Sequence, residues 1–338
     1  MESKEIKPET NLEKELEESH DFEKELEDQL SVYEEKSEND SEKELEEISK
    51  DIESKEIENK NKFKYLVISG GGMYGISFIG AIKYLEEIEI NEFEEYCGVS
   101  AGSMVSLLSI IGVGYKELYN FYMNYDLNKL VDIDLESILE NYGLLKGNKI
   151  IKLLSIFMKY KKINPEITMK ELYELTSKKL IIGVTNLTKI KGEYISYENY
   201  PDMPVLLAIK ASISAPFLFE PLIYNGNYYV DGGISDNFPM HLYKGEKEKY
   251  TIGMKIYSDY EKCEIKSLLD YCEAIRLIIF KTIEHIPNIG LENIIYIKTD
   301  EIDGDFINFI NFEMEKEVIK KMLNIGYEAA KSAKFLKI

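Results

Sequence analysis

The residues with the clearest chemical meaning are Ser100 and its neighbours, in the order Gly98-Val99-Ser100-Ala101-Gly102. In such a G-x-S-x-G motif, Gly98 and Gly102 permit a turn too tight for a Cβ, and the turn lifts the serine hydroxyl above the sheet. A helix after the turn aims its N-terminus at the oxygen that becomes negative when the hydroxyl attacks a carbonyl. The motif predicts a nucleophile, with an ordinary turn as the alternative.

A glycine cluster lies upstream of this serine, in the order Ser69-Gly70-Gly71-Gly72-Met73-Tyr74-Gly75. Successive glycines let backbone N–H groups converge on an anion, as in phosphate loops and oxyanion holes. The expected oxyanion-hole residues are Gly70, Gly71, Gly72 and Gly75. A dinucleotide fingerprint is the alternative, but no acidic residue caps a second strand where a ribose site requires one.

A third candidate is Asp231, which a β-rich run delivers to a glycine turn, Val230-Asp231-Gly232-Gly233. In isolation this pattern is typical of an ordinary turn aspartate. The order Ser100, Asp231 and then His241 or His285 would also suit a Ser-His-Asp esterase. Both histidine positions are more typical of surface or packing residues, so the triad is kept as the alternative.

The pattern of apolar residues predicts the elements that position these groups. Strands are expected at 63–68, 96–99, 180–184, 250–256 and 293–297, and helices at 76–88, 101–111, 147–160, 168–178, 265–283 and 312–335. Thr168 and Glu171 form a capping box at the start of one helix. Successive strand, loop and helix units imply parallel strands joined by right-handed crossovers. The predicted fold is therefore α/β, a three-layer α/β/α sandwich with a mostly parallel central sheet.

Charge divides the chain into two regions. Residues 1–62 hold 24 Asp/Glu and 10 Lys, out of a formal net charge of −21 for all 338 residues. They repeat the sequence EKELEE and contain too few apolar groups to offset the entropy of ordering. The prediction is an acidic, low-complexity, disordered region at 1–62, with an acidic docking tail as the alternative, followed by one catalytic domain at 63–338.

Cysteine content and hydropathy bear on the compartment. The three cysteines, Cys97, Cys263 and Cys272, lack metal-ligand spacing, which favours a reduced compartment over a disulfide framework. The first residues have neither a basic region nor an apolar core of a signal peptide. The longest apolar stretch falls short of the roughly 18 to 20 residues that cross a bilayer. We expect a cytoplasmic protein that is not secreted through a signal peptide, with peripheral membrane contact at most.

Two further segments complete an ordered set of motifs. Residues 211–221 read Ala-Ser-Ile-Ser-Ala-Pro-Phe-Leu-Phe-Glu-Pro, and Asp231-Gly232-Gly233 is followed by Asn237-Phe238-Pro239. Together with the glycine loop and the GVSAG turn, these segments resemble patatin-like phospholipases over roughly residues 64–239. The resemblance implies that Ser100 and Asp231 form a catalytic dyad and that the glycine loop supplies oxyanion N–H groups.

The resemblance also implies a substrate, and at one position this chain differs from the family. The expected substrate is an acyl ester of a glycerophospholipid or related lipid, hydrolysed without a metal or cofactor, and no nucleic-acid partner is expected. Members of that family usually carry Arg or Lys in the glycine loop where this chain has Tyr74. The missing cation motivates a second alternative, a catalytically weak lipid-binding or interaction protein on the same fold.

Overall fold

The computed structural model describes residues 62–130, 140–258, 265–266, 268–284, 293–300, 302 and 314–336, together with Lys24. The chain divides into two compact units, Met1–Ser49 and Lys50–Ile338. Apart from Lys24, the described residues all belong to the second unit. The predicted disordered region at 1–62 therefore lies almost entirely outside the described residues, as do His285 and Cys263.

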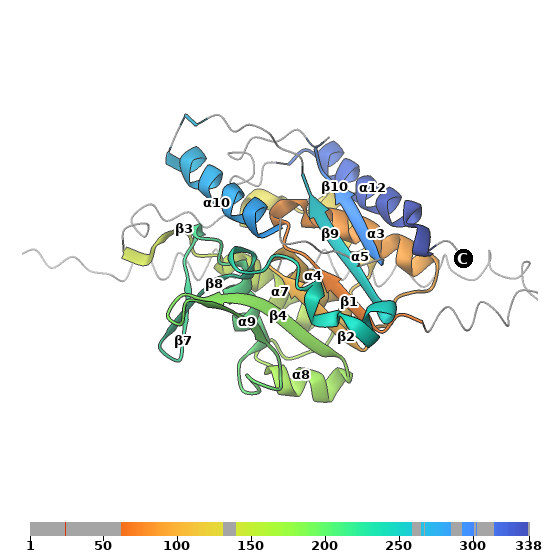
Figure 1. Cartoon of the computed structure of the whole chain (residues 1–338), viewed down its shortest axis with the longest axis horizontal. Helices are drawn as coiled ribbons and strands as arrows, with labels where there is room; N and C mark the ends of the chain where they lie inside the picture. Colours follow the sequence, from red (N-terminus) through yellow and green to blue (C-terminus); the bar gives the residue numbers. More distant parts are fainter. Residues whose placement is uncertain are drawn as a thin grey trace, which may run out of the picture. The chain divides into compact units, whose positions relative to one another are not determined.

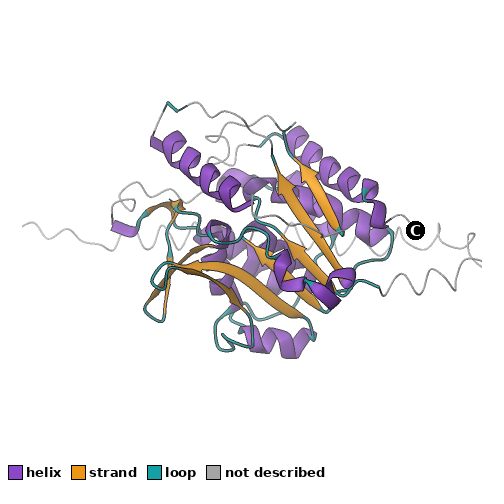
Figure 2. Cartoon of the chain, viewed as in Figure 1, coloured by secondary structure: helices purple, strands orange, loops and turns teal. Residues whose placement is uncertain are grey.

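An eight-stranded sheet forms the centre of the second unit (Figures 1 and 2). Seven strands follow the order β10-β9-β1-β2-β4-β8-β7, and β5 pairs with β4. The strands are β1 (Tyr65–Ile68), β2 (Glu95–Val99), β4 (Lys179–Asn186), β5 (Lys191–Ile195), β7 (Leu222–Tyr224), β8 (Asn227–Asp231), β9 (Thr251–Tyr257) and β10 (Ile294–Lys298). The five strands from β10 to β4 are parallel, whereas β5, β8 and β7 pair antiparallel with their neighbours. The predicted α/β class with a mostly parallel sheet is confirmed.

Helices flank this sheet. They are α3 (Ile76–Glu87), α4 (Ala101–Ile110), α5 (Tyr115–Asn124), α7 (Asn148–Tyr160), α8 (Met169–Thr176), α9 (Val205–Ile213), α10 (Leu268–Glu284) and α12 (Lys316–Ser332). Helix α4 packs on β1, β2 and β4, and α9 packs on β4 and β8. A two-stranded sheet, β3 (Gly143–Leu145) with β6 (Phe217–Phe219), lies outside the main sheet.

A cluster of buried apolar side chains joins β1, β2, β4 and β10 to the short 3-10 helix η4 (Met240–Tyr243). The cluster consists of Val67, Cys97, Ile181, Phe238, Met240, Tyr243 and Ile294. Burial raises the pKa of the Cys97 thiol and of the Tyr243 hydroxyl above their ordinary values. The two groups are therefore neutral core residues at physiological pH.

Helices α3 and α12 cross at two glycines. A Cβ on Gly80 would collide with the Leu323 carbonyl, and a Cβ on Gly326 would collide with the Ser77 carbonyl. Only hydrogen atoms can stand at these two positions if the helix backbones are to stay in contact. At the end of the crossing, the Tyr327 hydroxyl donates to Glu87 at 2.7 Å. The crossing attaches the C-terminal helix to the helix that follows the glycine loop.

Every predicted strand and helix overlaps an observed one, and the capping box is present, with the Glu171 N–H 3.2 Å from Thr168 Oγ1. Helix α9 was missed because its sequence, VLLAIKASI, is apolar nearly all round and so lacks helical periodicity. Within the described part of the chain, no helix combines the length and apolar character needed to span a membrane.

Candidate active site

Ser100 stands at the turn between β2 and α4. Its backbone angles are φ 51° and ψ −123°, in a region that a residue with a Cβ rarely occupies. The glycines on either side make the turn possible. A Cβ on Gly98 would strike the Gly102 carbonyl, and a Cβ on Gly102 would lie 2.5 Å from the Ile68 carbonyl oxygen. This close packing holds Ser100 in its strained backbone conformation. The side chain of Ser100 therefore stands at the carboxyl edge of the sheet.

The glycine loop lies directly against this turn. A Cβ on Gly70 would be 3.4 Å from Ser100 Cβ, and a Cβ on Gly75 would be 2.7 Å from Ala101 Cβ. On its other side, Gly70 touches the Asn237 side chain, and its N–H donates to the Asn237 carbonyl at 3.1 Å. Any side chain on Gly70 or Gly75 would push the loop away from the serine.

The loop amides differ in availability. The Gly70 N–H is already used by Asn237. Gly71 and Gly72 occupy the N-cap and first position of a 3-10 helix, η1 (Gly72–Gly75), where N–H groups have no acceptor within the helix. Gly72 is exposed and has φ 52°. Of the four glycines that the sequence analysis expects in an oxyanion hole, Gly71 and Gly72 thus have N–H groups without an acceptor in η1, while the Gly70 N–H is taken by Asn237.

Asp231 is the last residue of β8 and is only 2% exposed. Its N–H donates to the Ser214 carbonyl at 2.9 Å, and its carbonyl accepts from Thr185 Oγ1 at 2.9 Å. Carboxylate oxygen Oδ1 accepts the Gly233 N–H at 2.8 Å. The backbone on both sides of the carboxylate is thus fixed. Gly232 packs against the Gly183 carbonyl and has no room for a Cβ.

Strand register brings the serine and the aspartate together. On β4, Val99 pairs with Gly183, and Asp231 pairs with the next residue, Val184. Strand β5 occupies the other edge of β4 over Ile182–Asn186, so β2 and β8 must share one edge. They run toward each other along it and end at adjacent positions (Figure 1). The residue after β2 and the last residue of β8 therefore meet head to head.

Helix α9 links the two strand ends. Ser212 Oγ donates to the Gly183 carbonyl at 2.7 Å and accepts the Ser100 N–H at 2.8 Å. Two residues later, Ser214 accepts the Asp231 N–H. The hydrogen bonds of Ser100 within the described residues use its backbone N–H and carbonyl, which leaves its hydroxyl oxygen unengaged there.

Ser212 and Asn237 contact Ser100 and Gly70, and the sequence analysis quoted both within motifs without assigning them a role. Ser212 is fully buried and connects α9, β4 and the Ser100 turn. The Asn237 side-chain oxygen is buried beside Gly70 and accepts no hydrogen bond from the described residues. In the sequence, only position could have indicated a role for these two residues. Ser212 lies in the block before β8, and Asn237 lies shortly after Asp231-Gly232-Gly233.

His241 lies in a different polar group. Its Nδ1 is 3.2 Å from Asp236 Oδ2, and its Nε2 is 3.5 Å from the Tyr194 hydroxyl. The Tyr194 hydroxyl donates to the same Asp236 oxygen at 2.6 Å. Within the described residues, none of the His241 contacts reaches Ser100 or Asp231. The other histidine of the triad alternative, His285, lies outside the described residues.

Comparisons with known proteins bear on the family of this chain. The family model described as patatin-like phospholipase matches residues 66–243. A protein named probable lipid hydrolase, from Invertebrate iridescent virus 6, is 37% identical over 195 residues, which are 55% of this chain and 66% of that protein. The intracellular phospholipase A2 of Caenorhabditis elegans is 25% identical over 192 residues, which are 53% of this chain and 16% of that protein.

Among solved structures, VipD from Legionella pneumophila superposes with a TM-score of 0.51 and 19% identity, over 81% of this chain and 67% of that one. At this identity the likeness concerns the fold. The family model, by contrast, spans more than half of the chain and takes in the glycine loop, the serine turn and the aspartate strand. This chain therefore belongs to the patatin-like phospholipase family.

Proposed function

We propose that this chain hydrolyses acyl esters of lipids, with Ser100 as nucleophile and Asp231 as its base. The observation that carries the proposal is the head-to-head arrangement of β2 and β8 on one edge of β4. It delivers a strained serine and a buried carboxylate to adjacent positions from segments far apart in the sequence. A turn with only a structural role would not require both a strained serine and a buried carboxylate beside it.

In the first half of the reaction, Ser100 Oγ attacks the ester carbonyl and its proton passes to the Asp231 carboxylate. The carbonyl oxygen becomes an oxyanion, which the Gly71 and Gly72 N–H groups stabilise. The ester C–O bond then breaks, and the departing alcohol takes the proton from Asp231. The acyl group remains on Ser100.

In the second half, water attacks the acyl-enzyme and gives its proton to Asp231. Collapse of the second tetrahedral intermediate releases the fatty acid and returns the proton to Ser100 Oγ. The positive end of α4 and the loop amides act on the same oxyanion as before. The steps balance with water as the only co-reactant, so the scheme requires no metal or cofactor.

The proposed substrate is a glycerophospholipid or a related acyl lipid. Support comes from the family and from relatives named lipid hydrolase and phospholipase A2. We also propose a reducing, cytoplasmic location, which the free thiols of Cys97 and Cys272 favour. Residues 1–62 are proposed to form a region separate from the catalytic domain at 63–338.

Substitution of the nucleophile tests the proposal. Ser100→Ala should reduce turnover of a soluble chromogenic ester at least a thousandfold, because no other group supplies the attacking oxygen. Ser109→Ala, on the same helix, is the matched control and should retain wild-type turnover. A fluorophosphonate should add its phosphonyl group to Ser100 of the active protein, detected by mass spectrometry. Full turnover in Ser100→Ala, or no turnover in the wild type, would instead favour a different nucleophile or the lipid-binding alternative.

A further inference from the structure

Large apolar side chains are exposed on two hairpin turns and one helix. Ile190, in the turn between β4 and β5, is 91% exposed, and Ile223, on the β7–β8 hairpin, is 58% exposed. Tyr271 and Ile278, two turns apart on α10, are also exposed. We call the following set the apolar rim: Leu187, Ile190, Ile223, Tyr228, Tyr271 and Ile278. Exposing a side chain of this size to water costs about 2 kcal/mol relative to burying it.

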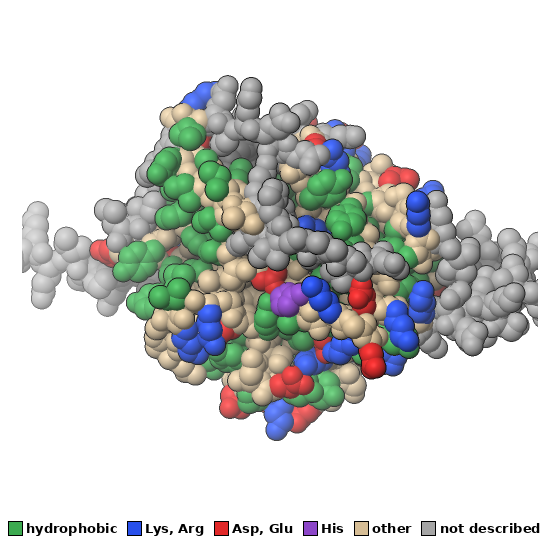
Figure 3. Space-filling view, viewed as in Figure 1, with side chains coloured by type: hydrophobic (Ala, Val, Ile, Leu, Met, Phe, Trp, Pro, Cys, Tyr) green, Lys and Arg blue, Asp and Glu red, His purple; other side chains and the backbone are tan. Residues whose placement is uncertain are grey.

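The apolar rim lies at the same end of the sheet as Ser100 and Asp231. Strand β4 runs parallel to β2 and continues three residues past Gly183, the partner of Val99, so its turn projects about 10 Å beyond the serine level. Strand β8 is antiparallel to β4, which puts the β7–β8 turn at the same end. Helix α10 contacts the η3 turn (Gly232–Ile234) that follows Asp231. Figure 3 shows apolar side chains gathered over α10 and over the β7 end of the sheet.

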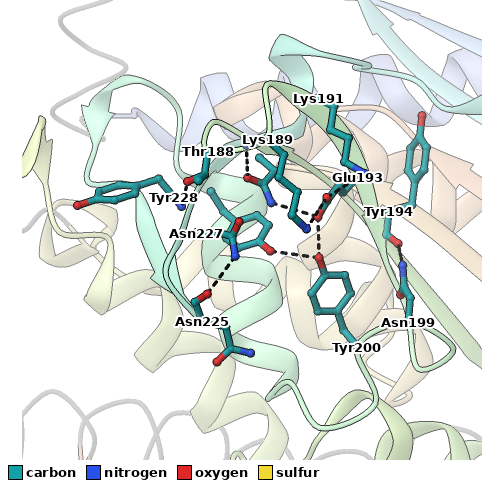
Figure 4. A network of polar contacts seen from close by, with 12 residues as sticks. Thr188, Lys189, Lys191, Glu193, Tyr194, Asn199, Tyr200, Asn225, Asn227 and Tyr228 are labelled. Carbon is teal, nitrogen blue, oxygen red and sulfur yellow. Dashed lines mark hydrogen bonds and ion pairs between the residues drawn. The ribbon is translucent and has the colours of Figure 1, made fainter.

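Two hydrogen bonds join the β4–β5 hairpin to the β7–β8 hairpin. The Leu187 N–H donates to the Tyr228 carbonyl at 2.9 Å, and the Tyr228 N–H donates to Thr188 Oγ1 at 2.9 Å. The first bond joins the backbone of one hairpin to the backbone of the other. The second, from Tyr228 to the Thr188 side chain, is drawn in Figure 4. The apolar side chains of the two hairpins therefore lie on segments that are hydrogen-bonded to each other, and not on independent loops.

Glu193 restrains the lysines that flank Ile190. Its Oε1 is 3.1 Å from Lys189 Nζ and 3.2 Å from Lys191 Nζ, and its side chain is only 9% exposed (Figure 4). Both lysine side chains therefore point toward Glu193, and Ile190 remains as the projecting residue of the turn. Its φ of 53° is a left-handed conformation that the turn imposes on a β-branched side chain.

The charge of these segments identifies the partner. In a chain of net charge −21, the 187–191 turn carries two lysines and no acid, and residues 222–229 carry no charge. On α10, the face that contains Tyr271, Ile275, Ile278 and Thr282 is also uncharged. Two lysines flank this apolar surface, and the carboxylate beside them, Glu193, is mostly covered and paired with both. Such a surface suits a lipid bilayer, in which the apolar groups enter the acyl region and the lysines lie near the head groups.

We propose that the apolar rim is the surface on which this protein docks to a lipid bilayer, so that acyl chains enter beside Ser100 from the membrane. The proposal rests on the proposed function for its choice of partner. A second copy of the chain is the other apolar partner, and the experiment below separates the two. Docking through side chains on turns and on one helix face is peripheral and needs no membrane-spanning segment.

Vesicle binding tests the proposal. The full chain carrying Ser100→Ala, which keeps the lipids intact, should sediment with vesicles of phosphatidylcholine and phosphatidylglycerol. Adding Ile190→Glu and Ile223→Glu should weaken this binding at least tenfold, because two carboxylates would enter the apolar layer. The control is Leu175→Glu, a residue about as exposed as Ile223 that lies on α8, which precedes the amino end of β4. This control should bind like its parent.

A soluble ester separates this proposal from the proposed function. With Ser100 restored, Ile190→Glu/Ile223→Glu should keep wild-type turnover of a monomeric chromogenic ester while losing turnover of vesicle lipids. Wild-type vesicle affinity in the double variant, or no affinity in its parent, would overturn the rim proposal whatever the turnover. A parent that dimerises in sedimentation velocity, with a monomeric double variant, would assign the surface to self-association instead.

Discussion

Ser100 adopts a backbone conformation that its own side chain disfavours, and its neighbours supply the compensation. Gly98 and Gly102 allow the backbone of α4 to approach β1 and β2 without an intervening Cβ. The Ser212 hydroxyl then accepts the Ser100 N–H, which at a helix start would otherwise lack an acceptor. Asp231 is positioned in the same manner, by the Gly233 N–H and the Ser214 carbonyl. The backbone around Ser100 can therefore take this conformation because Gly98, Gly102 and Ser212 are small.

The dyad and triad schemes share Asp231 and differ in whether a histidine takes the Ser100 proton. Asp231→Asn should reduce soluble-ester turnover by a hundredfold or more, because a carboxamide cannot take the Ser100 proton. His241→Ala should retain turnover within about threefold, because this imidazole contacts Asp236 and Tyr194. Initial rates at pH 7 check both variants, with circular dichroism as the folding control. The opposite ranking of the two losses would favour histidine as the base.

At the scale of elements, the crossing of α3 and α12 controls the position of the glycine loop, because α3 begins where that loop ends. Gly326→Ala should lower the free energy of unfolding by about 2 to 3 kcal/mol, since the new methyl must displace the Ser77 carbonyl of α3. Gly114→Ala is the matched control, because its methyl would meet flexible carboxylate ends at 3.2 and 3.4 Å. Urea titrations of both variants give the comparison. Equal losses would mean that the helix crossing adapts.

The β4–β5 hairpin contains a mostly covered carboxylate, Glu193, whose side chain is 9% exposed. Burial alone would raise the pKa of Glu193, but hydrogen bonds from Tyr200, Lys189, Asn186 and Lys191 outweigh it and lower the pKa to about 2. A carboxyl group with a depressed pKa stabilises the folded state fully above its unfolded pKa of 4.5. This contribution disappears as pH falls from there toward 2.

Glu193→Gln should therefore destabilise the protein at pH 7, by about 1 to 3 kcal/mol, with a smaller deficit at pH 3. Glu174→Gln removes an exposed partner of Lys170 and serves as the control, with an expected effect below about 0.5 kcal/mol. Unfolding curves for each variant and the wild type at pH 7, 5 and 3 measure the deficit. A deficit that is constant with pH would show that the Glu193 charge does not contribute.

At the scale of the whole molecule, charge is distributed unevenly along the chain. Residues 1–62 hold 24 acidic and 10 basic residues, against a net charge of −21 for the whole chain. Their removal should leave soluble-ester turnover within about twofold, because the proposed groups of the site all lie after residue 62. Binding to anionic vesicles should strengthen several-fold at low salt and converge with the full chain at high salt, as screening predicts. Lost turnover or an insoluble product would show that the catalytic domain extends into residues 1–62.

Local sequence determined the parts of this protein that depend on short-range backbone geometry. The apolar run before Ser69, the glycine loop and the G-x-S-x-G turn each impose their conformation within a few residues, so their strands and helices were predicted correctly. The G-x-S-x-G motif also identified Ser100 as a candidate, whereas Asp231 received its expected role from the resemblance to patatin-like phospholipases, because its own turn is typical of an ordinary aspartate.

Tertiary structure decided what depends on contacts between distant segments. The meeting of β2 and β8 on β4, the bond from Ser100 to Ser212, 112 residues away, and the crossing of Gly80 and Gly326 have no local signal. His241 illustrates the same limit, since chain order alone allowed it a place beside Ser100 and the fold pairs it with Asp236. A short motif restricts dihedral angles within one turn, whereas pairing between distant strands and helices is selected by the packing of the whole domain.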